Sequence, residues 1–261
     1  MTVNDVTSED AIQRWLPFRA QTGAAADALA LFCLPHAGGG ASAYRAWQHR
    51  LPGVAVLPVQ PAGRENRLRE PPYERMTPLV ADLADVILAE VSGGRRYAVY
   101  GHSLGALVSF ELLREIRRRG GPAPVHLFVS GCVAPHRSFD DGPPVRGMSS
   151  SELVELLRKL GGTPDWLLND PSVLEMILPA MQADFSVKET YTYYPEPPLD
   201  VPITALPSTD DPRAGRELVA AWREQTTGRF DLHTYVGGHF AVFEQAKLTY
   251  KHVSEALRAW V

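Results

Sequence analysis

Residues 95–121 read RRYAVYGHSLGALVSFELLREIRRRGG, and this stretch decides the fold. Residues 95–100 are rich in β-forming side chains and predict a short buried strand. From Leu104 onward the apolar residues keep helical spacing as far as the glycines at 120–121, which predict the end of a helix. Ser103 lies between strand and helix in the pattern Gly-x-Ser-x-Gly, which is typical of a nucleophile elbow.

Gly101 and Gly105 have a physical role in this interpretation. An elbow turns sharply from strand to helix, and a Cβ atom at either position would collide with neighbouring backbone. The turn raises the serine hydroxyl above the sheet and places the first amides of the helix beside a developing negative charge. An ordinary glycine-rich turn remains the alternative, because the five-residue pattern alone is common.

Length, charge and cysteine content restrict the class of protein. The chain has 261 residues, which suits one well-filled α/β domain better than two. A net charge of −4 argues against nucleic acid as the main partner. The sequence has no apolar run that predicts a membrane span, and its acidic first residues do not resemble a signal peptide. Cys33 and Cys132 lie in apolar runs, so we expect reduced core thiols and a cytoplasmic protein.

Predicted strands and helices alternate along the chain. Strands are expected at residues 28–34, 54–59, 95–100, 125–131, 202–206 and 230–236, and helices at 78–92, 104–119, 216–225 and 244–260. The first of these helices should have Thr77 as its N-cap and Pro78 as its first residue. This alternation predicts a single α/β domain over residues 1–261, with a mostly parallel sheet and helices on both faces.

Residues 134–200 contain no convincing strand and interrupt the alternation. Ser149 and Glu152 predict a capping box for one helix, and a second helical segment at 173–191 contains Pro179, which should kink or split it. The first helix has an apolar stripe formed by Leu153, Leu156, Leu157 and Leu160. Placed after the fourth strand, the insertion would cover the carboxyl ends of the strands, where sites form in open sheets. Alternatively, the stripe simply packs on the core.

A serine nucleophile needs a base, and the base needs an acid that holds its tautomer. His239 lies in a glycine-flanked loop after the last predicted strand and is the expected base. His233 falls inside that strand, and His252 falls on the outer face of the last helix. The acid should follow the strand at 202–206, where Asp210 and Asp211 compete; the aspartate that is not the acid would cap a helix starting near Pro212. The local pattern leaves both open.

An oxyanion hole would need two backbone amides. One is that of Leu104, directly after the serine, and the other should come from the glycine-rich loop at 34–42, which reads LPHAGGGAS. This loop lacks the Lys-Ser/Thr ending of a phosphate-binding loop and the spacing of a dinucleotide fingerprint.

Seven ordered blocks resemble type II thioesterases, the stand-alone editing enzymes of polyketide and nonribosomal peptide synthesis. The blocks are LFCLPHAGGGASAYRAW, VQPAGRENRLREPP, YGHSLGALVSFELLR, LFVSGCVAPH, LRKLGGTP, LPAMQADF and GGHFAVFE. The resemblance covers residues 15–261 and implies an α/β-hydrolase fold with a helical lid at 134–200. It also implies hydrolysis of acyl thioesters on the phosphopantetheine arm of acyl or peptidyl carrier proteins, without a bound cofactor or metal, by a monomer.

By position, the resemblance places the nucleophile on Ser103, the base on His239 and the acid on Asp211. The oxyanion donors fall on the backbone amides of Ala37 and Leu104. The sequence departs from the family's pattern at three places, which are Pro207-Ser208 before the acid, Pro61-Ala62, and Gln182. The first departure keeps Asp210 as a minor candidate for the acid.

Two arginine-rich segments are candidates for docking an acidic carrier protein. They are residues 64–70 (RENRLRE) and the group Arg114, Arg117, Arg118 and Arg119. For the second group the alternative is a helix end stabilised by cations. Two rival functions share the same fold, namely a carboxylesterase for a small free ester and a binding module without chemistry.

Overall fold

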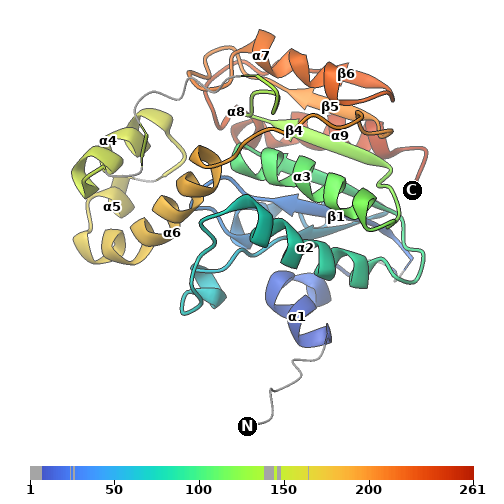
Figure 1. Cartoon of the computed structure of the whole chain (residues 1–261), viewed down its shortest axis with the longest axis horizontal. Coiled ribbons are helices and arrows are strands. Elements are labelled where there is room, and N and C mark those ends of the chain that lie inside the picture. The colour runs from blue at the N-terminus through green and yellow to red at the C-terminus, as the bar shows by residue number, and fades with distance from the viewer. Residues whose placement is uncertain (1–7, 24, 26, 138–143, 146–147, 164) are drawn as a thin grey trace.

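The fold is built on one sheet of six parallel strands, seen in a computed structural model that describes residues 8–23, 25, 27–137, 144–145, 148–163 and 165–261 (Figure 1). The strands are β1 (Leu29–Leu34), β2 (Val54–Pro58), β3 (Tyr97–His102), β4 (His126–Ser130), β5 (Ile203–Leu206) and β6 (Phe230–Leu232). Their order in the sheet is β2-β1-β3-β4-β5-β6. Each strand pairs in parallel with its neighbours, which confirms the predicted α/β fold.

Helices cover both faces of this sheet. They are α1 (Ser8–Trp15), α2 (Met76–Glu90), α3 (Leu104–Arg118), α4 (Ser150–Leu160), α5 (Asp165–Leu168), α6 (Pro171–Glu189), α7 (Arg216–Ala220), α8 (Ala241–Glu244) and α9 (Ala246–Leu257). Figure 1 shows α2 and α3 in front of the sheet and α9 behind it. Such coverage explains why the central strands β1, β3 and β4 are buried along their whole length rather than at alternate residues.

Successive side chains of a strand point to opposite faces of the sheet, so the core has two layers, one on each face. Phe32 and Val99 point into the layer under α2 and α3, which also contains α1. Leu31 and Tyr100 point into the opposite layer, where Trp47 and α9 pack. Burial in both layers removes the sheet from water and makes it a rigid base for the loops at its carboxyl edge.

The helices α4, α5 and α6 form an insertion between β4 and β5, which lies beyond one end of the sheet (Figure 1). The predicted capping box at Ser149 and Glu152 is present, and α4 ends at Gly161. The insertion has a small apolar cluster of its own, which includes Leu153, Leu157, Leu168, Leu178, Met181 and Phe185. Of the predicted stripe, Leu156 is half-buried against this cluster, whereas the side chain of Leu160 is outside the described residues.

Several boundary predictions were wrong. Helix α2 begins at Met76 with Arg75 at its N-cap, so Thr77 is not the cap; Pro78 still lies in the first turn, where its missing N–H costs nothing. Pro179 lies inside one unbroken helix, α6.

Other boundaries moved near the end of the chain. The helix expected over 216–225 begins at Arg216 as predicted, four residues after Pro212, but its second half is a 3-10 helix. The last helix is two elements, α8 and α9. Strand β6 ends at Leu232, so His233 follows the strand rather than lying within it.

Candidate active site

Ser103 occupies a strained turn between β3 and α3. Its backbone φ is 55°, a left-handed value that costs a non-glycine residue energy, and its amide donates a hydrogen bond to the Ser130 carbonyl at 2.8 Å. A Cβ at Gly101 would lie 2.3 Å from the Gly105 carbonyl oxygen, and one at Gly105 would lie 2.2 Å from the Leu34 carbonyl oxygen. The two glycines are therefore required by close backbone packing, as the sequence predicted for an elbow.

His239 and Asp211 are hydrogen-bonded to one another. The distance between His239 Nδ1 and Asp211 Oδ2 is 2.8 Å, and both side chains are buried. The other carboxylate oxygen, Oδ1, accepts from the backbone amides of Arg213 at 2.9 Å and Ala214 at 3.3 Å. This arrangement holds the imidazole with Nδ1 protonated and leaves Nε2 to act as a base.

The hydrogen bonds to Asp211 keep it ionised. Burial alone would raise the pKa of this carboxyl, but the hydrogen bond and charge interaction with His239, together with the two backbone amides, hold it below its ordinary value. A carboxylate in this position orients the imidazole and stabilises the imidazolium that forms during proton transfer.

Asp210 lies apart from this pair. Its side chain is exposed and accepts a hydrogen bond from the Thr209 hydroxyl at 3.0 Å, while its amide donates to the Gly237 carbonyl at 2.9 Å. The structure thus brings one of the two competing aspartates to His239 and leaves the other in solvent.

Two further histidines, His102 and His36, lie near His239 and are held neutral. The ring of His102 lies 4.9 Å from that of His239, and its Nδ1 is 2.9 Å from the Ser130 hydroxyl. Burial, followed by the charges of His239 and His36, lowers the pKa of His102 well below its usual range. Burial, His239 and Arg64 likewise lower the pKa of His36 to about 4. Neutral neighbours do not oppose the charge that His239 gains when it accepts a proton.

Gly131 is a site residue that the sequence reasoning did not single out. It has a φ of 57°, and an added Cβ would lie 2.7 Å from His102 Cε1 and 3.1 Å from His239 Cε1. The absence of a side chain there makes room for both rings. Its position immediately after β4 was the only available signal.

The two expected oxyanion amides lie on adjoining segments. Leu104 is the first residue of α3, so its amide has no acceptor within the helix. The next residue, Gly105, packs against the carbonyl oxygens of Leu34 and Pro35, where the glycine-rich loop begins. The loop then turns through a hydrogen bond from the Gly39 amide to the His36 carbonyl at 2.9 Å. Ala37 therefore lies in a tight turn beside the start of α3.

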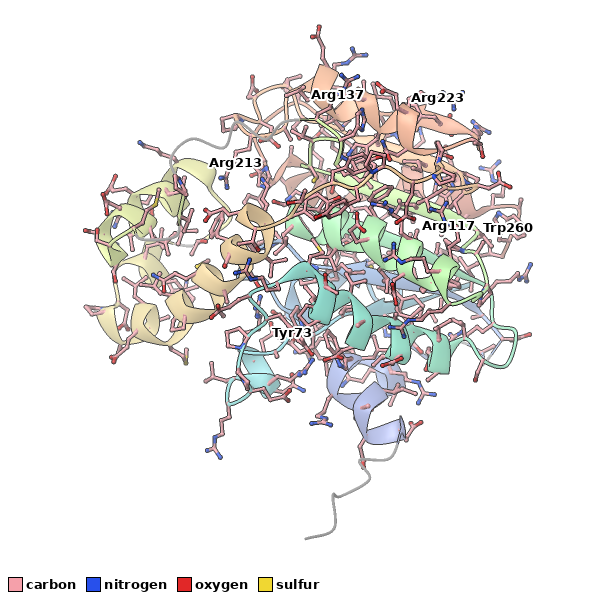
Figure 2. All side chains as sticks on the ribbon, in the orientation of Figure 1. Tyr73, Arg117, Arg137, Arg213, Arg223 and Trp260 are labelled. Carbon is pink, nitrogen blue, oxygen red and sulfur yellow. The ribbon has the colours of Figure 1, made fainter. Side chains whose placement is uncertain are left out.

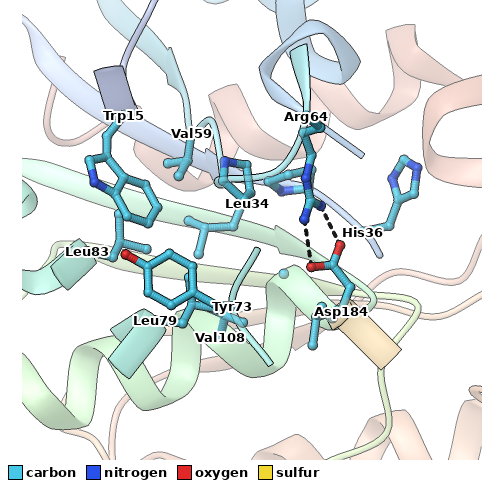
Figure 3. A pocket seen from close by; sticks show the side chains of 14 residues that line it. Trp15, Leu34, His36, Val59, Arg64, Tyr73, Leu79, Leu83, Val108 and Asp184 are labelled. Atoms are coloured by element: carbon cyan, nitrogen blue, oxygen red, sulfur yellow. Dashed lines mark hydrogen bonds and ion pairs between the residues drawn. The ribbon is translucent and has the colours of Figure 1, made fainter. Parts of the chain in front are cut away.

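An apolar pocket extends from this region into the core (Figure 3). The apolar side chains that line it are those of Trp15, Leu34, Val59, Tyr73, Leu79, Leu83, Leu104 and Val108. At one end, Arg64 and Asp184 form a buried ion pair, drawn as dashed lines in Figure 3. A pocket of this composition suits a hydrocarbon chain whose reacting end lies at Leu104.

Most arginines of the two arginine-rich segments form ion pairs within the chain. In the first segment, Arg64 pairs with Asp184 and Arg67 pairs with Glu70, whereas Arg69 is exposed. The four arginines of the second group form ion pairs on and beside α3, with Glu111, Glu115, Glu196 and Asp85 as the acceptors. The charges of the second group are therefore largely compensated, which argues against that group as a docking surface for an acidic partner.

The described part of the chain offers neither a metal-binding cluster nor a membrane-spanning helix. Within them, His, Cys, Asp and Glu side chains form no group of three or more that could hold a metal ion. None of the helices in this part of the chain is both long and apolar enough to cross a membrane.

Comparison with known proteins identifies the family. A model of the thioesterase domain matches residues 30–260. The thioesterase PikA5 of Streptomyces venezuelae is 39% identical over 84% of this chain and 77% of its own length. The solved structure of the RedJ thioesterase from the prodiginine pathway of Streptomyces coelicolor is 42% identical, with a TM-score of 0.82 over 90% of this chain and 92% of RedJ.

A second solved structure carries the more specific description. BorB, a type II thioesterase from the borrelidin biosynthetic cluster, is 39% identical and has a TM-score of 0.82, covering 90% of this chain and 95% of BorB. The sheet order, the elbow and the family match agree with one another. The chain belongs to the thioesterase family, has the α/β-hydrolase fold, and is an enzyme of the type II class that hydrolyses acyl thioesters.

Proposed function

We propose that this enzyme removes acyl groups from the phosphopantetheine arm of acyl or peptidyl carrier proteins, and that misloaded or stalled groups are its physiological substrates. The observation that carries the proposal is the hydrogen bond between His239 and Asp211, together with the 4.9 Å separation of the His239 ring from that of His102, the residue before the strained Ser103. The similarity to thioesterases of polyketide and peptide biosynthesis supports the carrier-bound form of the substrate.

The proposed chemistry has two halves. In the first, His239 accepts the proton of the Ser103 hydroxyl while the oxygen attacks the thioester carbonyl, and the amides of Ala37 and Leu104 stabilise the oxyanion. The C–S bond then breaks, and His239 returns the proton to the departing thiolate. A thiol with a pKa of about 8.5 is a good leaving group, so this step needs little acid assistance. In the second half, His239 activates a water molecule that hydrolyses the acyl-Ser103 ester.

The acyl chain is expected to occupy the apolar pocket beside Leu104. Trp15, Leu79 and Val108 contribute apolar surface to that pocket, and each methylene group buried there contributes about 0.8 kcal/mol to binding. The phosphopantetheine arm would approach from the side of the insertion. Residues 134–200 would then act as a lid within a single domain of residues 1–261.

The proposed reaction requires no bound cofactor or metal, because the serine, the base and the oxyanion donors complete it. The carrier protein supplies the phosphopantetheine. We also propose a monomer that acts in the cytoplasm, where the buried thiols of Cys33 and Cys132 would stay reduced.

The test compares one short acyl group offered on a carrier protein, on coenzyme A and as a simple oxygen ester. A preference for the carrier in kcat/KM, lost in Ser103→Ala, is the expected result. Faster turnover of the oxygen ester would instead indicate a carboxylesterase. Binding of the acyl carrier without turnover would indicate a binding module.

A further inference from the structure

Asp184 of α6 connects the helical insertion to the glycine-rich loop. Its side chain is buried, and Oδ2 accepts a hydrogen bond from the Gly38 amide at 2.7 Å. Oδ1 accepts from Arg64 Nη2 at 2.9 Å, and Arg64 Nη1 bonds to Oδ2 as well, which makes the ion pair bidentate (Figure 3). Asp184 lies 120 residues from Arg64 in the chain, so nothing in the local sequence pattern connects the two.

Arg64 holds the same loop from its other side. Its Nη1 donates to the Gly39 carbonyl at 3.2 Å, and its Nε donates to the Ala62 carbonyl at 3.2 Å. The carboxylate and the guanidinium thus bind the backbone of two adjacent loop residues, Gly38 and Gly39. The Arg64 charge also compensates the Asp184 carboxylate, which would otherwise oppose an oxyanion forming near Ala37.

Helix α6 also packs closely against the glycine-rich loop through Met181, near these hydrogen bonds. Gly38 has a φ of 77°, and a Cβ there would lie 2.6 Å from the Cε and Cγ atoms of Met181. One residue beyond Asp184, the ring of Phe185 lies beneath the guanidinium of Arg213, 5.5 Å from ring centroid to Cζ. Figure 2 shows Arg213 extending from the core toward the insertion. Helix α6 therefore contacts both the glycine-rich loop and the loop that carries Asp211.

The hydrogen bond from the Gly38 amide to Asp184 restricts the orientation of the Ala37 backbone, because a peptide group is planar. The Gly38 N–H and the Ala37 carbonyl belong to one planar group and point in opposite directions. Fixing the N–H on Asp184 therefore fixes the Ala37 carbonyl away from α6 and restricts the rotation that sets the Ala37 amide. A loop with three successive glycines would otherwise sample several orientations of that amide.

We propose that Asp184, paired with Arg64, is a positioning residue for the oxyanion hole, so that its geometry depends on α6 remaining docked. This inference rests on the proposed function, because it assumes that the Ala37 amide stabilises the oxyanion. Neither side chain is expected to touch the reacting atoms. Because Arg64 and Asp184 also line one end of the apolar pocket, the substrate and both analogues in the test carry an acetyl group, which is too short to fill that pocket. With this short group, the effect of the two side chains should appear in transition-state stabilisation and not in ground-state binding.

Two double variants separate positioning from folding. Asp184→Leu with Arg64→Met replaces the buried ion pair with apolar groups of similar volume, a change that proteins commonly tolerate. It removes the hydrogen bonds that these two side chains make to Gly38 and Gly39. Asp184→Asn with Arg64→Gln removes both charges and keeps an acceptor for the Gly38 amide. Val187→Ala, a fully buried change in the same helix, serves as the control for loss of packing.

The readouts are kcat, KM and the affinities for two acyl analogues. A trifluoromethyl ketone forms a tetrahedral oxyanion on Ser103, whereas a thioether resembles only the bound substrate. For the Leu/Met variant we expect kcat and ketone affinity to fall together by about 100-fold or more, with KM and thioether affinity within about threefold. The Asn/Gln variant should retain kcat within about tenfold, and Val187→Ala should match the wild type.

Several results would overturn the inference while leaving the proposed function intact. These are unchanged kcat in a folded Leu/Met variant, equal losses of affinity for both analogues, or equal losses in the Leu/Met and Asn/Gln variants. Failure of the proposed function looks different, because the wild type itself would then not hydrolyse the thioester, or Ser103→Ala would retain activity.

Discussion

Asp211 and His239 are 28 residues apart in the chain and are joined by a hydrogen bond of 2.8 Å between two buried side chains. Asp210, next to Asp211, is exposed, and its side chain bonds to the neighbouring Thr209. We therefore expect Asp211→Asn to lower kcat by about 10⁴, the loss known for the equivalent change in a serine protease. Asp210→Asn should change kcat by a few-fold at most. Steady-state kinetics of the two variants provide the check, and equal losses would contradict the assignment of the acid.

Gly131 is expected to tolerate alanine poorly because of the two histidine rings. Gly131→Ala places a Cβ 2.7 Å from His102 Cε1, and the ring movement that relieves this contact would displace His239 as well. Gly120 is a matched control, because its φ of 69° is similar but a Cβ there meets nothing within 4 Å.

Both alanine variants should lose about 1–2 kcal/mol of unfolding free energy from backbone strain. Gly131→Ala should lose more than that and should also lower kcat at least tenfold, whereas Gly120→Ala should keep its activity. Denaturant unfolding and kinetics measure the two effects. If the two variants lost equal stability and activity, the close approach of Gly131 to the rings of His102 and His239 would have no effect on either property.

The stability of the protein should fall between pH 6.5 and pH 4 partly because of His126. Burial, reinforced by Arg229 and opposed by Asp231, lowers the pKa of His126 to about 4. The unfolded chain binds a proton near pH 6.5, whereas the folded protein does not do so until about pH 4, so the free energy of unfolding falls as the pH falls through that range. The loss by pH 4 is on the order of 3 kcal/mol.

His126→Gln tests this pH dependence away from the active site. Glutamine can still bond to the Thr204 hydroxyl, which lies 2.8 Å from the imidazole Nε2. Urea unfolding at a series of pH values should show a shallower decline for the variant. His36 and His102 would still contribute, because their pKa values are also lowered by burial. Identical slopes for variant and wild type would rule out His126 as a contributor.

A larger side chain in the apolar pocket should change the acyl preference. Val108 lines the pocket beside Leu104 and Gly105. Val108→Phe should lower kcat/KM for an octanoyl thioester by at least about tenfold, while an acetyl thioester should be affected by a few-fold at most. The ratio of the two values is the measurement, since it is insensitive to the amount of active enzyme. An unchanged ratio would mean that the acyl chain binds elsewhere.

Sequence patterns predicted the fold well where the chemistry of turns and burial is local. The elbow between β3 and α3 and the capping box at Ser149 each follow from a few adjacent residues, and the parallel sheet follows from the alternation of strands and helices along the chain. Boundaries were less accurate. Pro78 was read as the first residue of α2, although the first turn accepts proline at several positions, and the helix begins at Met76.

The less predictable features depend on contacts between distant segments. The local residue pattern does not distinguish Asp211 from Asp210. The two differ in the folded protein because His239, which lies in another loop, forms a hydrogen bond with Asp211. Arg64 was read as part of a charged docking segment, yet it is buried against Asp184. The residue type alone does not show whether an arginine is exposed to solvent or paired in the core. Only the tertiary structure distinguishes the two cases.

The most direct test of the proposed mechanism is detection of the acyl-enzyme. An acyl carrier protein is mixed with the enzyme, the reaction is quenched within milliseconds, and the enzyme is analysed by intact-protein and peptide mass spectrometry. We predict a transient gain of one acyl group, located on the peptide that contains Ser103, and no adduct or turnover in Ser103→Ala. Rapid turnover with no adduct on Ser103, or turnover by Ser103→Ala, would contradict the account.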